Sequence, residues 1–210
     1  MFGFLPDVTL QQFLQRTVAI ALVVTVQGIV ATMLLRLRGD DGPWMDGRAG
    51  PNPVSHLDII GYVTVVFTAV GWSKALDHDA RRLTRPLGDA VAITVASAVA
   101  LWLLAIGARS LRPLVIGGMT GDAGMAVSLL LASLADVALL AGVVSLLPFP
   151  PFLGGLMLQA MLRGSKRAFA LTTSNSVRTV SGLAASVVLI VGWADAPLQS
   201  VTRVLSSLVR

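Results

Sequence analysis

Long runs of uncharged, apolar residues constrain this chain more than any other feature. Residues 17–35 and 90–108 carry no charge, and residues 126–147 carry only Asp136. Each run has about the length at which a helix crosses a hydrocarbon core of roughly 30 Å. With 55% hydrophobic residues, 13% charged residues and a mean hydropathy of +0.79, the chain lies outside the range of soluble domains. The sequence therefore predicts an all-α integral membrane protein, since a backbone in lipid must satisfy its own hydrogen bonds.

Shorter apolar segments complete the predicted bundle. Residues 59–73 are short for a span, so they cross thinned bilayer, re-enter the membrane, or recruit neighbouring residues. Residues 155–162 predict a half-length helix, and residues 180–194 predict one more span. We therefore expect a polytopic helical bundle of about five transmembrane segments, within a range of four to six.

The chain divides at the basic stretch that follows the half-length helix. Residues 1–162 form the predicted transmembrane core, and residues 163–210 contain a basic linker, a transmembrane segment and an amphipathic helix. In this last helix the apolar residues recur at steps of three and four, as Leu198, Val201, Leu205 and Leu208. Such a stripe lies on the membrane surface or packs onto a partner helix, and the sequence favours neither.

The charge balance restricts the classes of partner. Lys and Arg number 16 against 11 Asp and Glu, which gives a net charge of +5, and the basic residues lie mostly between the apolar runs. This dispersion indicates contact with anionic lipid headgroups and argues against nucleic-acid binding. The chain has no cysteine, which excludes disulfides, thiolate metal sites and cysteine nucleophiles.

The segment "SLLPFPPFLGG", residues 145–155, interrupts an apolar run with three prolines and a Gly-Gly pair. Each proline removes a backbone donor and clashes with the preceding turn, so a helix cannot continue undisturbed through Pro148, Pro150 and Pro151. Inside a membrane such a break is tolerated only where protein or a water-filled cavity surrounds it. We therefore expect the break to frame a site.

Three motifs, in this order along the chain, carry a family resemblance. They are "NPVSHLDIIG" at residues 52–61, "GWSKALDHDARRLTRP" at residues 71–86 and "SLLPFPPFLGG" at residues 145–155. Together they resemble the short bacterial branch of the site-2 protease family, which consists of intramembrane zinc metalloproteases. The resemblance runs from about residue 17 to about residue 161. It implies a site-2-protease-like core with a Pro-Gly broken helix, in a multi-pass protein of a bacterial cytoplasmic or intracytoplasmic membrane.

The catalytic residues of that family do not carry over. In the family, two histidines on the first helix and an aspartate of the late motif bind zinc, and a glutamate activates the bound water. By the register of the resemblance, Gln27 and Ala31 stand at the histidine positions, Gly28 at the glutamate and Leu153 at the aspartate. Ser145 replaces a substrate-orienting asparagine. The resemblance therefore implies a pseudoprotease, without catalysis, bound metal or cofactor.

Other ligand and nucleophile sets are weaker. The two histidines, His56 and His78, have no histidine partner at helical spacing, although Asp58 and Asp79 lie nearby in the sequence. His56 matches a non-ligand histidine of the family, so a structural role is favoured over a zinc site built from these four residues. Ser/His/Asp hydrolysis also lacks support, because no serine occupies a Gly-x-Ser-x-Gly turn.

Two further features lie within the apolar segments. A carboxylate inside a span is energetically expensive, so Asp136 needs a partner such as a neighbouring helix or Ser133, or else serves a functional site. The stretch "SGLAAS" at residues 181–186 places small residues, including Gly182 and Ser186, on one helical face. Such a face packs either within the chain or against another chain.

Two functional hypotheses follow. The first is an inactive, site-2-protease-like accessory or scaffold subunit that binds transmembrane segments of a larger membrane complex, whether photosynthetic, respiratory or other. We expect Gly154 and Gly155 to approach the first helix near Gln27 and Gly28 in this case. The candidate groove or partner contacts are Ser145, Pro148, Pro151, Gly154, Gly155, Gly182 and Ser186. The second hypothesis is a small transporter or proton-conducting component centred on Asp136 and the broken helix.

Overall fold

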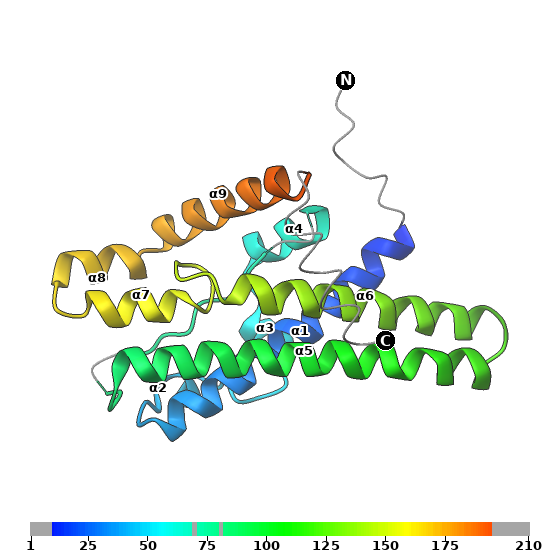
Figure 1. The fold of residues 1–210 in the computed structure, drawn as a ribbon, viewed down its shortest axis with the longest axis horizontal. Coiled ribbons are helices and arrows are strands. Elements are labelled where there is room, and N and C mark those ends of the chain that lie inside the picture. Colours follow the sequence, from blue (N-terminus) through cyan, green and yellow to red (C-terminus); the bar gives the residue numbers. More distant parts are fainter. Residues whose placement is uncertain (1–9, 69–70, 80–81, 195–210) are drawn as a thin grey trace.

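The computed structural model describes residues 10–68, 71–79 and 82–194, and within these ranges helices dominate and no strand occurs (Figure 1). An antiparallel bridge pairs Leu57 with Ser73. The all-α prediction is therefore confirmed for this part of the chain. The helices are α1 (Leu10–Leu37), α2 (Gly42–Met45), α3 (Pro53–His56), α4 (Ile59–Thr68), α5 (Pro86–Gly118), α6 (Gly121–Ser145), α7 (Gly155–Leu162), α8 (Lys166–Thr173) and α9 (Asn175–Ala194).

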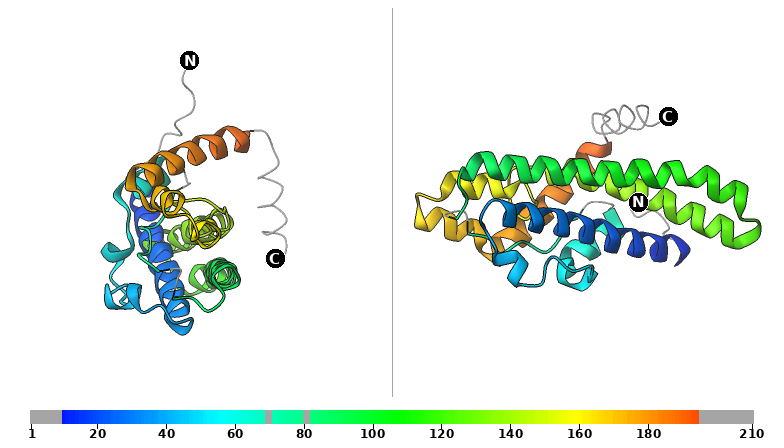
Figure 2. Two further views of the ribbon diagram at one scale, coloured as in Figure 1. Left: turned by 90° about the vertical axis from the view of Figure 1, so that its left-hand side faces the viewer. Right: turned by 90° about the horizontal axis from the view of Figure 1, so that it is seen from below.

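Three of these helices, α1, α5 and α6, are long and apolar enough to cross a membrane. The antiparallel α5 and α6 run side by side along the longest axis of the molecule (Figure 1), and Gly121 begins α6 with a φ of 78° that glycine adopts without a Cβ penalty. Helix α1 packs against both at a steep inclination (Figure 2). The three helices indicate a membrane-embedded protein.

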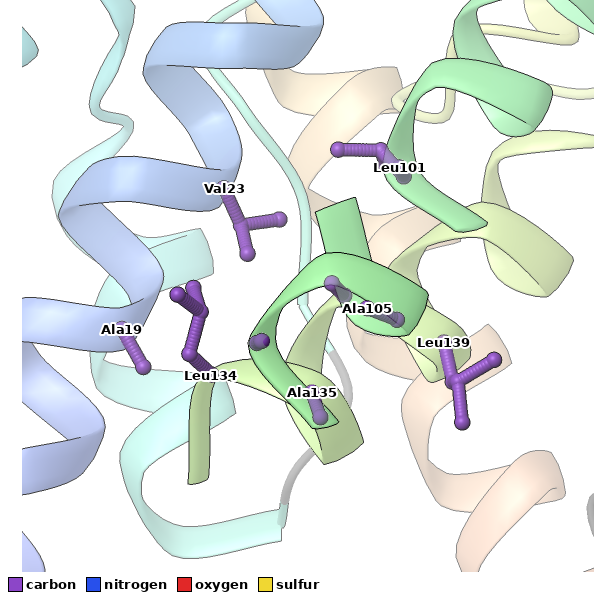
Figure 3. Packing of buried hydrophobic residues seen from close by; sticks show 9 residues of the cluster. Ala19, Val23, Leu101, Ala105, Leu134, Ala135 and Leu139 are labelled. Carbon is purple, nitrogen blue, oxygen red and sulfur yellow. The ribbon is translucent and has the colours of Figure 1, made fainter. Parts of the chain in front are cut away.

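Small side chains allow these helices to approach closely. Ala19 of α1, Ala105 of α5 and Ala135 of α6 are at most 1% exposed and meet in one cluster with Leu101 and Leu134 (Figure 3). Alanine-rich contacts of this kind are typical of helices in lipid, where close van der Waals packing replaces the hydrophobic effect as the driving force.

The outer face of α5 has the opposite character. Val91, Val95, Val99 and Leu103 follow one another at steps of four residues and are all exposed. A four-residue step keeps side chains on one helical face, so these residues form a continuous apolar stripe on the outside of the bundle. A soluble protein would bury such a stripe, whereas a lipid environment accepts it.

The predicted break in the apolar run is present. Helix α6 ends at Ser145, a compact turn covers residues 146–154, and α7 begins at Gly155. The turn closes when the Gly154 amide donates to the Ser145 carbonyl at 2.7 Å. A Cβ on Gly154 would lie 2.8 Å from the carbonyl carbon of Leu147, so glycine is required there. The chain thus satisfies the break with its own backbone.

Two sequence expectations concern segments outside the three long helices. The helix predicted over residues 59–73 is too long, because α4 has 10 residues and residues 71–79 are extended. The backbone amide of Lys74 donates to the His56 carbonyl at 2.8 Å, so this segment pairs with the end of α3 instead of continuing α4. The predicted span at residues 180–194 lies within α9, and the predicted amphipathic helix at residues 198–208 lies outside the described residues.

Candidate functional site: a groove beside the broken helix

Gln27, Ser145 and Leu153 come from three separate segments and line one small pocket of about 30 Å³. Gln27 lies on α1, Ser145 ends α6, and Leu153 belongs to the turn before α7. Trp72, in the extended segment, forms another wall of the pocket. A cavity of this size holds about one or two water molecules, and the Gln27 amide supplies a polar group to bind them.

Ala31 lies one turn after Gln27 and is fully buried. It packs in a cluster with Leu35 of α1 and Leu156 and Ala160 of α7, and Leu153 packs against the same cluster. Three of the four positions that the resemblance assigns to zinc chemistry, Gln27, Ala31 and Leu153, therefore lie around the start of α7. Apolar side chains occupy two of these three positions.

Gly28, the fourth position, lies against a different partner. The His56 ring covers Gly28 so closely that a Cβ there would lie 2.6 Å from Cε1 and 2.9 Å from Cγ of His56. The expected approach of Gly154 and Gly155 to Gly28 is wrong, because the atoms nearest to those two glycines belong to their own turn, residues 146–150. The turn packs back on itself, and His56 from the preceding loop occupies the space beside Gly28.

His56 itself is completely buried. Its Nε2 atom lies 3.2 Å from the Gly50 carbonyl, and its Nδ1 atom is buried without a hydrogen-bond partner among the described residues. Burial lowers the pKa of His56 below its ordinary value of 6.5, an effect that the Gly50 hydrogen bond opposes. The histidine is thus a neutral packing residue, as its match to a non-ligand position implied.

The small pocket continues along the extended segment. Ser73, Phe152 and Leu153 are shared with a second pocket, and Lys74 and Arg178 line both this second pocket and a third one of about 600 Å³. We refer to these three connected pockets as the groove. Its inner end is apolar, whereas Lys74 and Arg178 make its outer part positively charged.

Two buried side chains in the first loop hold the extended segment in place. Arg48 donates from Nη1 to the Lys74 carbonyl at 3.2 Å and from Nη2 to the Ala75 carbonyl at 2.8 Å. The Asp40 carboxylate accepts from the backbone amide of Asp79 at 2.8 Å. Sequence reasoning treated this loop as solvated turns, and only the burial of Arg48 and Asp40 shows that it positions one wall of the groove.

Helix α9 closes the groove from the other side. A Cβ on Gly182 would lie 2.8 Å from both Pro151 and the Trp72 ring, and Ser186 is 2% exposed. The Ser181 hydroxyl donates to the Pro150 carbonyl in the broken turn. Gly182 and Ser186, which we named as partner-contact candidates, therefore serve packing within the chain. Pro148 is exposed and Pro151 is buried.

Asp136 lies elsewhere. Its carboxylate accepts from Nη2 of Arg109 on α5 at 3.2 Å, and its side chain is 74% exposed. Ser133 lines the same cavity, but the ion-pair partner is Arg109, which sequence reasoning did not name. Asp136 lines none of the three pockets of the groove. The structure thus separates the intramembrane carboxylate from the broken helix.

Metal ligands are not gathered in the described part of the chain. No group of three or more His, Cys, Asp or Glu side chains within it is arranged to hold a metal ion. Among the four residues of the weaker zinc hypothesis, the Asp58 carboxylate accepts from the Gly61 amide at 2.9 Å, and Nδ1 of His78 faces the Leu76 carbonyl at 3.4 Å. These contacts are local turn contacts.

Comparisons of the chain with protein-family models, with curated proteins and with solved structures found no match. The fold and the groove therefore define the protein only as a helical membrane protein with three candidate spans and a groove beside a broken helix.

Proposed function

We propose that this chain is a catalytically inactive, site-2-protease-like membrane protein that acts as an accessory or scaffold subunit. In this role, the groove beside the broken helix binds a transmembrane segment of another integral membrane protein. The partner belongs to a larger membrane complex, whether photosynthetic, respiratory or other. We place the chain in a bacterial cytoplasmic or intracytoplasmic membrane.

One observation carries this proposal. Gln27, Ser145 and Leu153 are far apart in the sequence, and the motif register assigns them to a single site; all three line one pocket. Ala31 packs in the adjoining cluster with Leu153. A chain without any relation to the family would have no reason to bring these positions together. The side chains present there are suited to packing, since none of the four is a strong metal ligand.

The chemistry of the groove indicates the kind of segment that it accepts. Trp72, Phe152 and Leu153 offer an apolar inner end, where a partner helix gains van der Waals contacts. Lys74 and Arg178 lie toward the outer part. We therefore expect a partner whose apolar span is followed by an acidic residue at the membrane surface, since opposite charges fix register.

We further propose about five membrane segments. Helices α1, α5 and α6 cross the membrane, α9 adds another crossing with its 20 residues, and the short helices α4 and α7 enter the membrane without crossing it alone. At 1.5 Å per residue the 10-residue α4 measures only about 15 Å, roughly half of a hydrocarbon core.

Site-specific photocrosslinking tests the proposal. A benzoylphenylalanine residue replaces Lys74, which lies in the groove, and in a matched control it replaces Leu103, which lies on the outer stripe of α5 and is 63% exposed. In native membranes we expect a discrete protein adduct at position 74 that is absent at position 103. The same adduct at both positions, or lipid adducts alone, would contradict binding in the groove.

The alternative is a small transporter or proton-conducting component centred on Asp136. The cavity of about 490 Å³ beside this carboxylate favours it. The distance of Asp136 from the groove weakens the version that combined it with the broken helix. Proton flux into liposomes that contain the purified protein, abolished by Asp136→Asn, would favour the transporter and count against the accessory subunit.

A further inference from the structure

A second cavity, separate from the groove, lies between the first turns of α1 and the middle of α6. It measures about 490 Å³ and combines charged, polar and apolar walls. Arg16 comes from α1, Arg109 from α5, and Ser133 and Asp136 from α6. Leu129 and Leu140 lie on the same face of α6 as Ser133 and Asp136 and make the cavity apolar above and below the charges.

The position of this cavity along the bundle is informative. Residues 17–35 and 90–108, 19 residues each, form uncharged segments of α1 and α5 that measure about 28 Å. Arg16 and Arg109 are the charged residues immediately beyond these segments, and both line the cavity. At the opposite end of the same segments Arg38 pairs with Asp89 at 2.6 Å. The cavity therefore lies at one boundary of a hydrocarbon core of roughly 30 Å.

The charges in the cavity do not cancel. Two guanidinium groups face one carboxylate, which leaves a net positive charge at neutral pH. Asp136 accepts from Nη2 of Arg109, and a guanidinium carries five N–H donors in a planar fork. The Arg109 side chain is 27% exposed, so it reaches the cavity from a partly desolvated position, where charge-assisted hydrogen bonds gain strength.

We propose that this cavity binds an anionic phospholipid. The phosphodiester accepts hydrogen bonds from Arg109, with Ser133 as a further donor, and an acyl chain lies along Leu129 and Leu140. A volume of about 490 Å³ falls within the range of ligand pockets, roughly 300–1,000 Å³. Asp136 opposes the lipid charge while it holds the Arg109 fork in place. The site thus selects for an anionic headgroup, and Asp136 moderates the affinity.

Native mass spectrometry of the full-length protein in mild detergent tests this assignment. The protein is titrated with dioleoyl phosphatidylglycerol and, separately, with dioleoyl phosphatidylcholine, and the bound lipids are counted. We expect tighter binding of phosphatidylglycerol. Arg109→Gln should weaken it by about tenfold or more, because charge-assisted hydrogen bonds are lost. Asp136→Asn should strengthen it by about threefold to tenfold, because the repulsive charge is removed.

The opposite signs of these two changes separate a lipid site from a merely structural ion pair. Loss of lipid binding in both variants, or equal binding of the two lipids, would overturn the proposal. Arg163→Gln, which removes an exposed charge at another place, is the matched control and should leave binding unchanged. Inorganic phosphate at millimolar concentration should not displace the lipid; full displacement would assign the site to a free phosphate instead.

Two variants keep the test decisive if Arg109→Gln fails to fold. Arg109→Lys retains the charge and should keep the preference for phosphatidylglycerol, with reduced affinity because the planar fork is lost. Asp136→Asn retains the size of the side chain, and its pair is largely exposed, so it should fold. An affinity for phosphatidylglycerol that is unchanged or lower in Asp136→Asn would refute the site on its own.

Discussion

Gly28→Ala should destabilise the protein through His56. The new Cβ would lie 2.6 Å from Cε1 and 2.9 Å from Cγ of the His56 ring, with Nδ1 closer still. Carbon atoms in contact are ordinarily about 3.5–4.0 Å apart, so the ring has to move. The ring is fully buried and Nε2 lies 3.2 Å from the Gly50 carbonyl, so a displacement breaks this hydrogen bond as well.

The magnitude follows from three contributions. Overpacking of a filled core costs about 1–3 kcal/mol, and the lost hydrogen bond costs about 0.5–1.5 kcal/mol. Alanine offsets about 0.5–1 kcal/mol of this, because it loses less backbone entropy in a helix than glycine does. The free energy of unfolding should therefore fall by about 2 kcal/mol.

Unfolding monitored by tryptophan fluorescence in detergent measures this change. The matched control is Gly107→Ala in α5, where a Cβ meets no atom within 4 Å, so this variant should be neutral or slightly stabilised. In a His56→Ala background the ring is absent, and Gly28→Ala should then behave like the control. If Gly28→Ala costs no more than Gly107→Ala, or costs the same with and without the His56 ring, the reasoning is refuted.

Four further outcomes are expected. Burial lowers the pKa of His56 and His78, so the unfolded chain binds more protons than the folded one, and the free energy of unfolding should fall as the pH drops from about 7 through the lowered pKa values. Replacement of both histidines by glutamine should flatten this profile in denaturation curves at pH 7.5 and 5. Asp89→Ala should cost about 3 kcal/mol, because it leaves Arg38 and the Arg85 amide without a carboxylate that is 2% exposed, whereas Asp136→Ala should cost less than about 1 kcal/mol in the same assay. Gly182→Leu should lower the melting temperature by several degrees more than Gly107→Leu, since only the former meets Pro151 and Trp72. Elemental analysis of the purified protein should find far less than one zinc per chain, and about one zinc per chain would contradict the pseudoprotease assignment.

The long helices were predictable because an uncharged run of span length has few alternatives to a helix. Their ends were less so. Helix α5 continues through Arg109 and Pro113 to Gly118, because charges end a hydrophobic run without ending a helix. The second predicted span failed at its end, since the apolar run of residues 59–73 reads equally well as helix or extended chain. Pairing with His56 decided between the two.

The candidate site was predictable only in part. The order of the motifs was sufficient to place Gln27, Ser145 and Leu153 together, and they line one pocket. The contact of Gly28 with His56 was not foreseen, because a loop residue 28 positions later fixes it. The Arg109–Asp136 pair was missed for a similar reason, since it depends on the antiparallel register of α5 and α6. Such contacts leave no periodic signal in a sequence.

The packing around α1 bears on how the groove relates to the family it resembles. A glutamate at position 28 would need the space of the His56 ring, and a histidine at position 31 would enter a cluster in which Ala31 is fully buried. Loss of ligands alone would have left an open cavity, yet only about 30 Å³ remains beside Gln27. Buried neighbours fill the rest, so the ligand positions and their surroundings form one repacked core. A core of this kind makes the inner wall of the groove dry and rigid, and a rigid apolar wall favours helix packing over hydrolysis, which needs a positioned water.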